Sequence, residues 1–247
     1  MIKAIKAALS RLKHDVVDSQ RLYAQWEQIQ LKKLLQYLDV DAVFDIGANQ
    51  GQYAGMLRRG GYQGHIFSFE PNPRDAAVLR QRSARDDKWI ISELAISNQD
   101  GVARFNVMQS SQFSSLSTPS HEDVNLFVKL NAVSETIEVK TERLEKTLRR
   151  LQSEYGFVRP FLKMDTQGYD VNIFKGSANI VQEFVGLQSE LAIAKLYADS
   201  VDFREALTVY ESHGFTLSAL VPNNAGHFPR LVEVDCIMIR SDLVPAK

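Results

Sequence analysis

The hydrophobic pattern of the chain changes near residue 39. Before this point, apolar residues recur every three or four positions, which is the spacing of amphipathic helices. We expect one helix over residues 1–16 and a second from about Asp18 to Leu38, with Asp18 or Ser19 as its N-cap. Lysines and arginines accompany the apolar positions of residues 1–16. That segment therefore either docks on a membrane surface or a partner, or simply covers the domain.

After residue 39, short apolar runs alternate with helical segments. Helices are expected over residues 50–60, 74–85 and 203–213, and another with Thr141 as its cap and Gly156 at its end. A serine-rich loop is expected over residues 110–120. Strands are expected over residues 42–46, 65–69, 89–95, 102–107, 137–140, 161–164, 185–191, 215–220 and 231–239. This alternation predicts an α/β fold with a mostly parallel sheet, so we divide the chain into a helical extension (1–39) and one α/β domain (40–247).

Composition narrows the class of protein. With 247 residues, 45% of them hydrophobic and 24% charged, the chain has the composition of a globular protein. A net charge of −1 lacks the basic excess of nucleic-acid-binding proteins, so no nucleic-acid partner is expected. Cys236 is the sole cysteine, which excludes an internal disulfide. Without a signal peptide or a spanning apolar segment, we expect a cytoplasmic protein, membrane-peripheral if residues 1–16 dock on a bilayer.

The candidate ligand site begins in the turn after the first predicted strand. Asp45 lies within that strand, and Gly47, Asn49 and Gly51 follow it. The two glycines allow close backbone approach, and asparagine is well suited to a left-handed turn. Glu70 ends the second predicted strand, 25 positions after Asp45, where an acidic side chain can accept hydrogen bonds from ribose hydroxyls. The pattern indicates a cofactor that contains a nucleoside.

Two common nucleotide motifs do not fit. A nicotinamide fingerprint requires Gly-x-Gly-x-x-Gly, but Asn49 and Gln52 occupy the second and third glycine positions counted from Gly47. The Gly-Lys-Ser/Thr loop of nucleotide triphosphatases is absent from the sequence. A dehydrogenase and a triphosphatase are therefore disfavoured.

Several motifs together resemble class I methyltransferases that use S-adenosylmethionine, and more closely the FkbM family of methyltransferases. The resemblance covers about residues 40–240, and its motifs occur in the order of the family. They are Phe44-Asp45-Ile46-Gly47-Ala48-Asn49-Gln50-Gly51, Phe69-Glu70-Pro71-Asn72-Pro73, Ala95-Ile96-Ser97-Asn98 with Gly101, Ser114-Ser115-Leu116, Leu162-Lys163-Met164-Asp165-Thr166-Gln167-Gly168, Glu190 with Tyr197, Gly214-Phe215, and Asp235.

The resemblance implies a Rossmann-like class I methyltransferase fold, with a mostly parallel seven-stranded sheet and helices on both faces. It also implies methyl transfer to a hydroxyl of a sugar, glycolipid or related metabolite. By position, the methionine part of the cofactor would be lined by Asp45, Gly47, Asn49 and Gly51. Glu70 would hold the ribose with Asn72 in support, and the adenine would lie against Ala95 and Ser97. The segment with Ser114 and Ser115 would close over the cofactor. Asp165 would face the methionine amino group or the acceptor.

A hydroxyl acceptor needs a base, because it is poorly acidic and must lose its proton as the new bond forms. Asp165 and Glu190 are the leading candidates for this catalytic role, since both are expected at strand ends beside the methyl site. His121 and His227, in polar loops, are alternatives. A divalent cation held by Asp165 and Glu190 would need a third oxygen ligand that the sequence does not identify, so no metal is expected.

Two other functions remain open at this point. The first is methylation of nitrogen or a carboxylate on a small molecule, although Asp165 is followed by Thr166-Gln167-Gly168 rather than by the Pro-Pro-Tyr/Phe of amine methyltransferases. The second is an inactive methyltransferase fold that serves as a binding module. The presence of both Gly47 and Glu70 argues against this second function.

Overall fold

The computed structural model describes residues 21–120, 127–223 and 229–245. The predicted helix over residues 1–16 lies outside this part of the chain, as do Asp18, Ser19, His121 and His227. The first described helix is α2 (Leu22–Tyr37), which lies within the helix predicted from about Asp18 to Leu38. Among the described residues, no helix combines the length and apolar composition that a membrane span requires.

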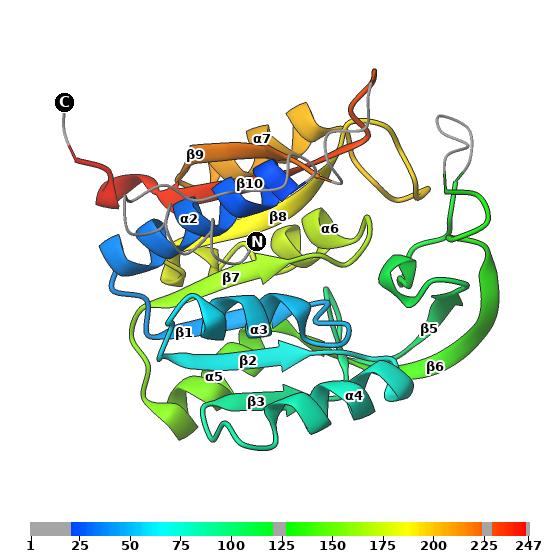
Figure 1. Cartoon of the computed structure of the whole chain (residues 1–247), viewed down its shortest axis with the longest axis horizontal. Coiled ribbons are helices and arrows are strands. Elements are labelled where there is room, and N and C mark those ends of the chain that lie inside the picture. The colour runs from blue at the N-terminus through cyan, green and yellow to red at the C-terminus, as the bar shows by residue number, and fades with distance from the viewer. Residues whose placement is uncertain (1–20, 121–126, 224–228, 246–247) are drawn as a thin grey trace, which may run out of the picture.

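A seven-stranded sheet in the order β3-β2-β1-β7-β8-β10-β9 forms the centre of the molecule (Figure 1). Its strands are β1 (Ala42–Ile46), β2 (His65–Phe69), β3 (Trp89–Ser92), β7 (Pro160–Met164), β8 (Gly186–Ala192), β9 (Phe215–Pro222) and β10 (Glu233–Arg240). β10 runs antiparallel to both of its neighbours, and the other pairs are parallel. This confirms the predicted mostly parallel, seven-stranded sheet.

Helices cover both faces of this sheet, as predicted (Figure 1). Successive residues of a strand point to opposite faces, so Val43 packs with one layer of helices and Phe44 with the other. One layer contains α2, α3 (Gln52–Arg59) and α4 (Pro73–Ser83). The other contains α5 (Leu144–Tyr155), α6 (Asp170–Lys175) and α7 (Phe203–Ser212). Short 3-10 helices occur at η3 (Val181–Glu183) and η5 (Ser241–Leu243).

A second, three-stranded sheet lies beyond the carboxyl ends of β1, β2 and β7 (Figure 1). It consists of β4 (Ala95–Ser97), β6 (Val133–Arg143) and β5 (Gly101–Met108), in that order. The 3-10 helix η2 (Ser111–Phe113) follows β5, within the predicted serine-rich loop.

Two predictions in this region were wrong. The single strand expected over residues 89–95 is interrupted after Ser92, because Ala95 pairs with Thr141 of β6 instead of continuing beside β2. Thr141 does not cap a helix, since it is a buried residue of β6. α5 begins only at Leu144, after Arg143, which makes no side-chain capping bond.

Gly51 controls the direction in which the chain leaves the first turn. It precedes α3 in the left-handed region, at φ 85°. A Cβ at this position would lie 2.6 Å from Leu79 Cδ1 and 2.8 Å from Trp89 Cζ2. Conformation and packing therefore both require glycine, and the turn is held against α4 and β3.

We predict that Gly51→Ala lowers the free energy of unfolding by about 2–4 kcal/mol, because it combines left-handed backbone strain with overpacking. Urea denaturation measures this loss. The matched control is Gly61→Ala, which places alanine at a similar φ of 91° but with no atom within 4 Å of the added Cβ. The control should lose only about 1–2 kcal/mol. Equal losses in the two variants would contradict the packing role of Gly51.

Candidate functional site

Three strand ends converge at one edge of the main sheet. The backbone N–H groups of Gly47 and Ala48 both donate to Phe69 O, at 3.2 and 3.0 Å, and Asp165 N donates to Ile46 O at 3.1 Å. Gly47 has φ 76°, and a Cβ there would overlap the carbonyl oxygen of Asp165. The ends of β1, β2 and β7 therefore pack against one another directly, and Gly47 allows the closest approach.

Glu70 joins two turns at this edge. Its carboxylate accepts a hydrogen bond from Asn49 N at 2.7 Å and another from Asn72 N at 2.8 Å. Burial raises the pKa of Glu70 to about 7, and the two backbone donors oppose that rise. Asn49 has φ 47°, so its amide reaches Glu70 from a left-handed turn. Glu70 is thus a buried carboxylate that titrates close to neutral pH.

A cavity opens beside these turns, between the main sheet and the second sheet. Some of its lining residues are apolar or aromatic, and the others are polar or belong to the glycine turn. The apolar lining is Ile46, Phe69, Pro71, Ala95, Ile96, Phe105 and Leu116. The remaining lining is Gly47, Asn49, Glu70, Ser111, Gln112, Ser114, Asp165, Thr166 and Gln167. Such a cavity suits a ligand that combines an apolar ring with polar groups.

Six of the residues predicted to contact or cover the ligand line this cavity, namely Gly47, Asn49, Glu70, Ala95, Ser114 and Asp165. Asn72 instead caps α4, accepting from Arg74 N at 3.2 Å and donating to Asp75 Oδ2 at 2.7 Å. Ser97 and Gly51 are buried outside the lining. Asp45 and Glu190 also lie outside it, in contacts described below.

Ser115 is not a lining residue either, but it fixes the segment that is. Its hydroxyl lies 2.9 Å from Thr166 O and 2.8 Å from Gln167 O, and it accepts from Ser117 N at 2.9 Å. Nearby, Asn49 Nδ2 donates to Ser111 Oγ at 3.1 Å. Residues 111–117 are therefore tied both to the turn after β1 and to the turn after β7.

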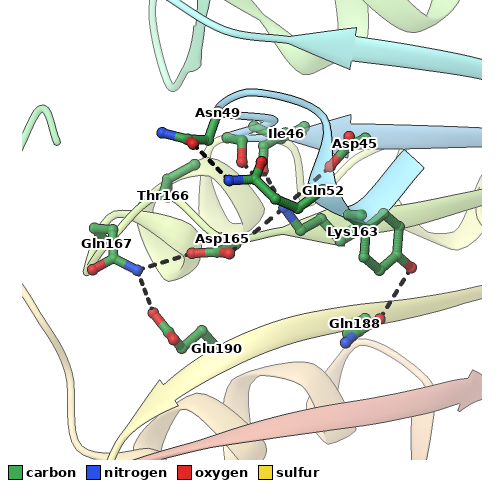
Figure 2. Close-up of polar contacts among 12 residues, drawn as sticks. Asp45, Ile46, Asn49, Gln52, Lys163, Asp165, Thr166, Gln167, Gln188 and Glu190 are labelled. Carbon is green, nitrogen blue, oxygen red and sulfur yellow. Dashed lines mark hydrogen bonds and ion pairs between the residues drawn. The ribbon is translucent and has the colours of Figure 1, made fainter. Parts of the chain in front are cut away.

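A buried lysine connects β1 with β7. Asp45 and Lys163 are register partners on these strands, and Lys163 Nζ lies 3.1 Å from Asp45 Oδ1 and 3.7 Å from Asp165 Oδ2 (Figure 2). Lys163 Nζ also donates to Gly47 O at 3.2 Å. Burial alone would lower the pKa of Lys163, but the charges of Asp45 and Asp165 hold it above its ordinary value. The lysine therefore stays charged between two carboxylates.

Asp45 and Lys163 begin a row of polar side chains, the polar row, which continues across the sheet through Gln188 to Glu27 of α2. Lys163 pairs in register with Gln188 on β8 (Figure 2). The side-chain oxygen of Gln188 accepts from Tyr53 OH at 3.0 Å. Gln188 Nε2 donates to Glu27 Oε1 of α2 at 2.6 Å. Burial raises the pKa of Glu27 to about 7. A helix outside the recognised motifs thus contacts the same row of side chains as Asp45 and Lys163.

The two predicted catalytic carboxylates lie on either side of one amide. Gln167 Nε2 donates to Asp165 Oδ1 at 2.9 Å and to Glu190 Oε2 at 2.7 Å (Figure 2). The side chain of Asp165 is 42% exposed. Glu190 is more enclosed, with Asn223 Nδ2 at 2.6 Å from its other oxygen. Burial, followed by the charge of Glu233, raises the pKa of Glu190 well above its ordinary value.

The motif analysis assigned no role to Gln167, Tyr197, Ser111 or Phe105, although the first two stand within its motifs. Gln167 has φ 56°, which the sequence does not signal. The others reach the site through tertiary contacts of the second sheet and the loop after β8. Only their occurrence near recognised motifs could have drawn attention to them.

We predict that Lys163→Met lowers the free energy of unfolding by about 3–5 kcal/mol, because Asp45 would be left as an unpaired, fully buried charge. Urea denaturation measures the loss. As a control, Lys175→Met removes an exposed lysine that pairs with Glu205 at 3.3 Å. This control should lose less than about 1 kcal/mol. A similarly small loss for Lys163→Met would show that the buried pair contributes little.

Comparisons with known proteins identify the family. The family model for the methyltransferase FkbM domain matches residues 45–217. The 2-O-methyltransferase NoeI of Sinorhizobium fredii (strain NBRC 101917 / NGR234) is 26% identical over 223 residues, which cover 87% of this chain and 85% of that protein. The solved structure of cofactor-bound Rv0187 from MTB has a similar fold, with a TM-score of 0.50, 16% identity, and coverage of 96% of this chain and 88% of that chain. The chain therefore belongs to the FkbM family and is an S-adenosylmethionine-dependent methyltransferase, as its motifs predicted.

Proposed function

We propose that the protein transfers a methyl group from S-adenosylmethionine to a hydroxyl of a sugar, glycolipid or related metabolite. The observation that carries this proposal is the position of Asp165, a partly exposed carboxylate in the wall of the cavity that also contains Glu70. A carboxylate at this place can accept the proton that a hydroxyl must lose. The similarity to NoeI, a 2-O-methyltransferase, supports a hydroxyl acceptor.

The cavity residues fit the cofactor by their chemistry. The apolar part, with Phe69, Ile96 and Phe105, would enclose the adenine, and Glu70 would accept hydrogen bonds from the ribose hydroxyls. The turn at Gly47 and Asn49 would face the methionine part. When bound, the cofactor supplies a methyl group that its sulfonium has already activated.

The other residues predicted to bind the cofactor would instead support the residues that contact it. Asn72 would orient Glu70 through its backbone amide, and Ser115 would hold the segment that includes Ser111 and Ser114 over the cavity. Gly51 would set the direction of the turn, and Asp45 would hold Lys163. Ser97 follows two lining residues, Ala95 and Ile96, and would support the adenine wall.

Asp165 is the better of the two candidate bases. One of its oxygens faces Gln167 and the other lies 3.7 Å from Lys163, but the side chain remains accessible from the cavity. Both oxygens of Glu190 accept hydrogen bonds from amides, one from Gln167 and one from Asn223. In this proposal the chain orients the acceptor and receives its proton on Asp165.

The affinity for S-adenosylhomocysteine should fall up to about tenfold as the pH is lowered from about 8 to about 6. The reason is that Glu70, with a pKa of about 7, loses the negative charge that accepts the ribose hydrogen bonds. Calorimetric titration over this range measures the effect. Glu70→Gln should bind more weakly and with little pH dependence, and a wild-type pH slope in that variant would contradict the role of Glu70.

The acceptor can be identified directly. Purified protein is incubated with methyl-labelled S-adenosylmethionine and an extract of glycans and glycolipids, and the labelled product is located by mass spectrometry and NMR. We expect an O-methyl ether on a sugar hydroxyl. Label on nitrogen or on a carboxylate would replace this proposal with one of the other methyl-transfer reactions. Binding of the cofactor without transfer to any component of broader metabolite pools would instead favour a binding module.

With the product in hand, Asp165→Asn tests the base. We predict a fall in kcat of about 100-fold or more, because asparagine cannot accept the proton, with S-adenosylhomocysteine affinity changed only a few-fold. Asp242→Asn is the control, since Asp242 is an exposed residue of η5 that pairs with Arg240. Activity of Asp165→Asn near the wild-type level across pH would eliminate Asp165 as the base.

A further inference from the structure

Both polar atoms of the Gln167 side chain have hydrogen-bond partners within the site. Its Nε2 donates to Asp165 Oδ1 at 2.9 Å and to Glu190 Oε2 at 2.7 Å, so both amide hydrogens face carboxylates (Figure 2). Its Oε1 lies 2.9 Å from the hydroxyl of Tyr197. The two carboxylates determine the orientation of the amide, because a carbonyl oxygen pointing at them would be repelled.

The backbone of Gln167 is held in an uncommon conformation. Its φ of 56° lies in the left-handed region, which a residue with a side chain seldom adopts. Several contacts hold the turn there: the Ser115 hydroxyl lies 2.8 Å from Gln167 O, and Asp170 Oδ1 accepts from Thr166 N at 2.8 Å. Strain of this kind persists where the surroundings over-determine it, often at functional sites.

We propose that Gln167 is a positioning residue that fixes Asp165 and Glu190 in one relative orientation, with Tyr197 as its support. This inference rests on the proposed function, in which Asp165 is the base. It adds a role for a side chain that contacts the proposed base through a hydrogen bond.

The charges around Glu190 show why such a donor is needed. Asp165 faces it from the end of β7, Asp170 from α6, and Glu233 and Asp235 from β10. Each of these carboxylates opposes ionisation of Glu190. Gln167 places a hydrogen-bond donor between Glu190 and Asp165, which opposes the rise in the pKa of Glu190 and keeps the two side chains from turning away from each other.

Tyr197 links this arrangement to the segment over the cavity. Its hydroxyl lies 2.7 Å from Phe113 O and 2.9 Å from Gln167 Oε1, and both of these atoms are acceptors. One hydroxyl proton therefore serves two partners. Phe113 ends η2, and Ser111 and Ser114 on either side of it line the cavity. The orientation of the Gln167 amide is thus coupled to the segment that would cover the cofactor.

Carboxyl NMR titration tests, without any acceptor, the hydrogen bond from Gln167 to Glu190 on which the positioning role depends. The carboxyl groups of glutamate are labelled with carbon-13, and the Glu190 resonance is followed with pH in the full chain. The main variant is Gln167→Gly, which removes the donor and suits a positive φ. The titration midpoint of Glu190 should rise by about one pH unit, as expected when a carboxylate loses a hydrogen-bond donor. Tyr197→Phe should shift it in the same direction by a smaller amount.

Gln182→Ala is the matched control. Gln182, in η3 before β8, also donates a hydrogen bond from its side-chain amide, but to the backbone oxygen of His213. It should leave the midpoint unchanged. An unchanged midpoint in a folded Gln167→Gly or Tyr197→Phe protein would overturn the proposal. If Gln167→Gly does not fold, Tyr197→Phe decides alone.

A rate measurement separates this proposal from the proposed function. With the identified acceptor, Gln167→Gly should lower kcat at least tenfold, and this fall should exceed any loss of S-adenosylhomocysteine affinity. Wild-type protein that transfers no label would contradict the proposed function, yet the NMR titration would still decide the hydrogen-bonding role of Gln167. A normal kcat together with a shifted midpoint would overturn the positioning role alone.

Discussion

The ion pair between Lys163 and Asp45 is the interaction on which the site depends. The two residues are register partners on adjacent parallel strands, and Asp45 is fully buried. A buried charge is tolerated only when it is paired, so the pair fixes the relative positions of β1 and β7 at their carboxyl ends. The turns that follow these strands carry Gly47 and Asp165. The ion pair thereby sets the distance between the turn at Gly47 and the proposed base.

The same polar row makes α2 part of the structure around the site. Glu27 contacts Gln188, and Leu31 and Leu35 of α2 join the buried cluster that contains Val43 of β1. The family match begins only at residue 45. Our division of the chain at residue 39 stays a prediction, but the packing of α2 shows that the core of the sheet extends to residues on both sides of it.

The sequence predicted the parts of the fold and site that depend on local pattern. Strand alternation and turn residues located β1, β2 and β7, and hence Gly47, Glu70 and Asp165, because functional groups of open parallel sheets gather at strand ends. The second sheet was not predicted as a separate sheet, since Ala95 and Thr141 become neighbours only through long-range pairing. Residues 111–117 also reach the cavity through long-range contacts, which the periodicity of the sequence does not indicate.

Burial explains how two acidic residues beside one amide can have different roles. Asp165 faces the cavity and is partly exposed, so it can meet an acceptor and later release a proton to water. Glu190 is enclosed by amides and by other carboxylates, and its pKa is raised chiefly by burial. The raised pKa favours its protonated form, so Glu190 is less suited than Asp165 to take a proton from an acceptor. Environments that separate two similar groups in this way are how a single site obtains distinct acid and base functions.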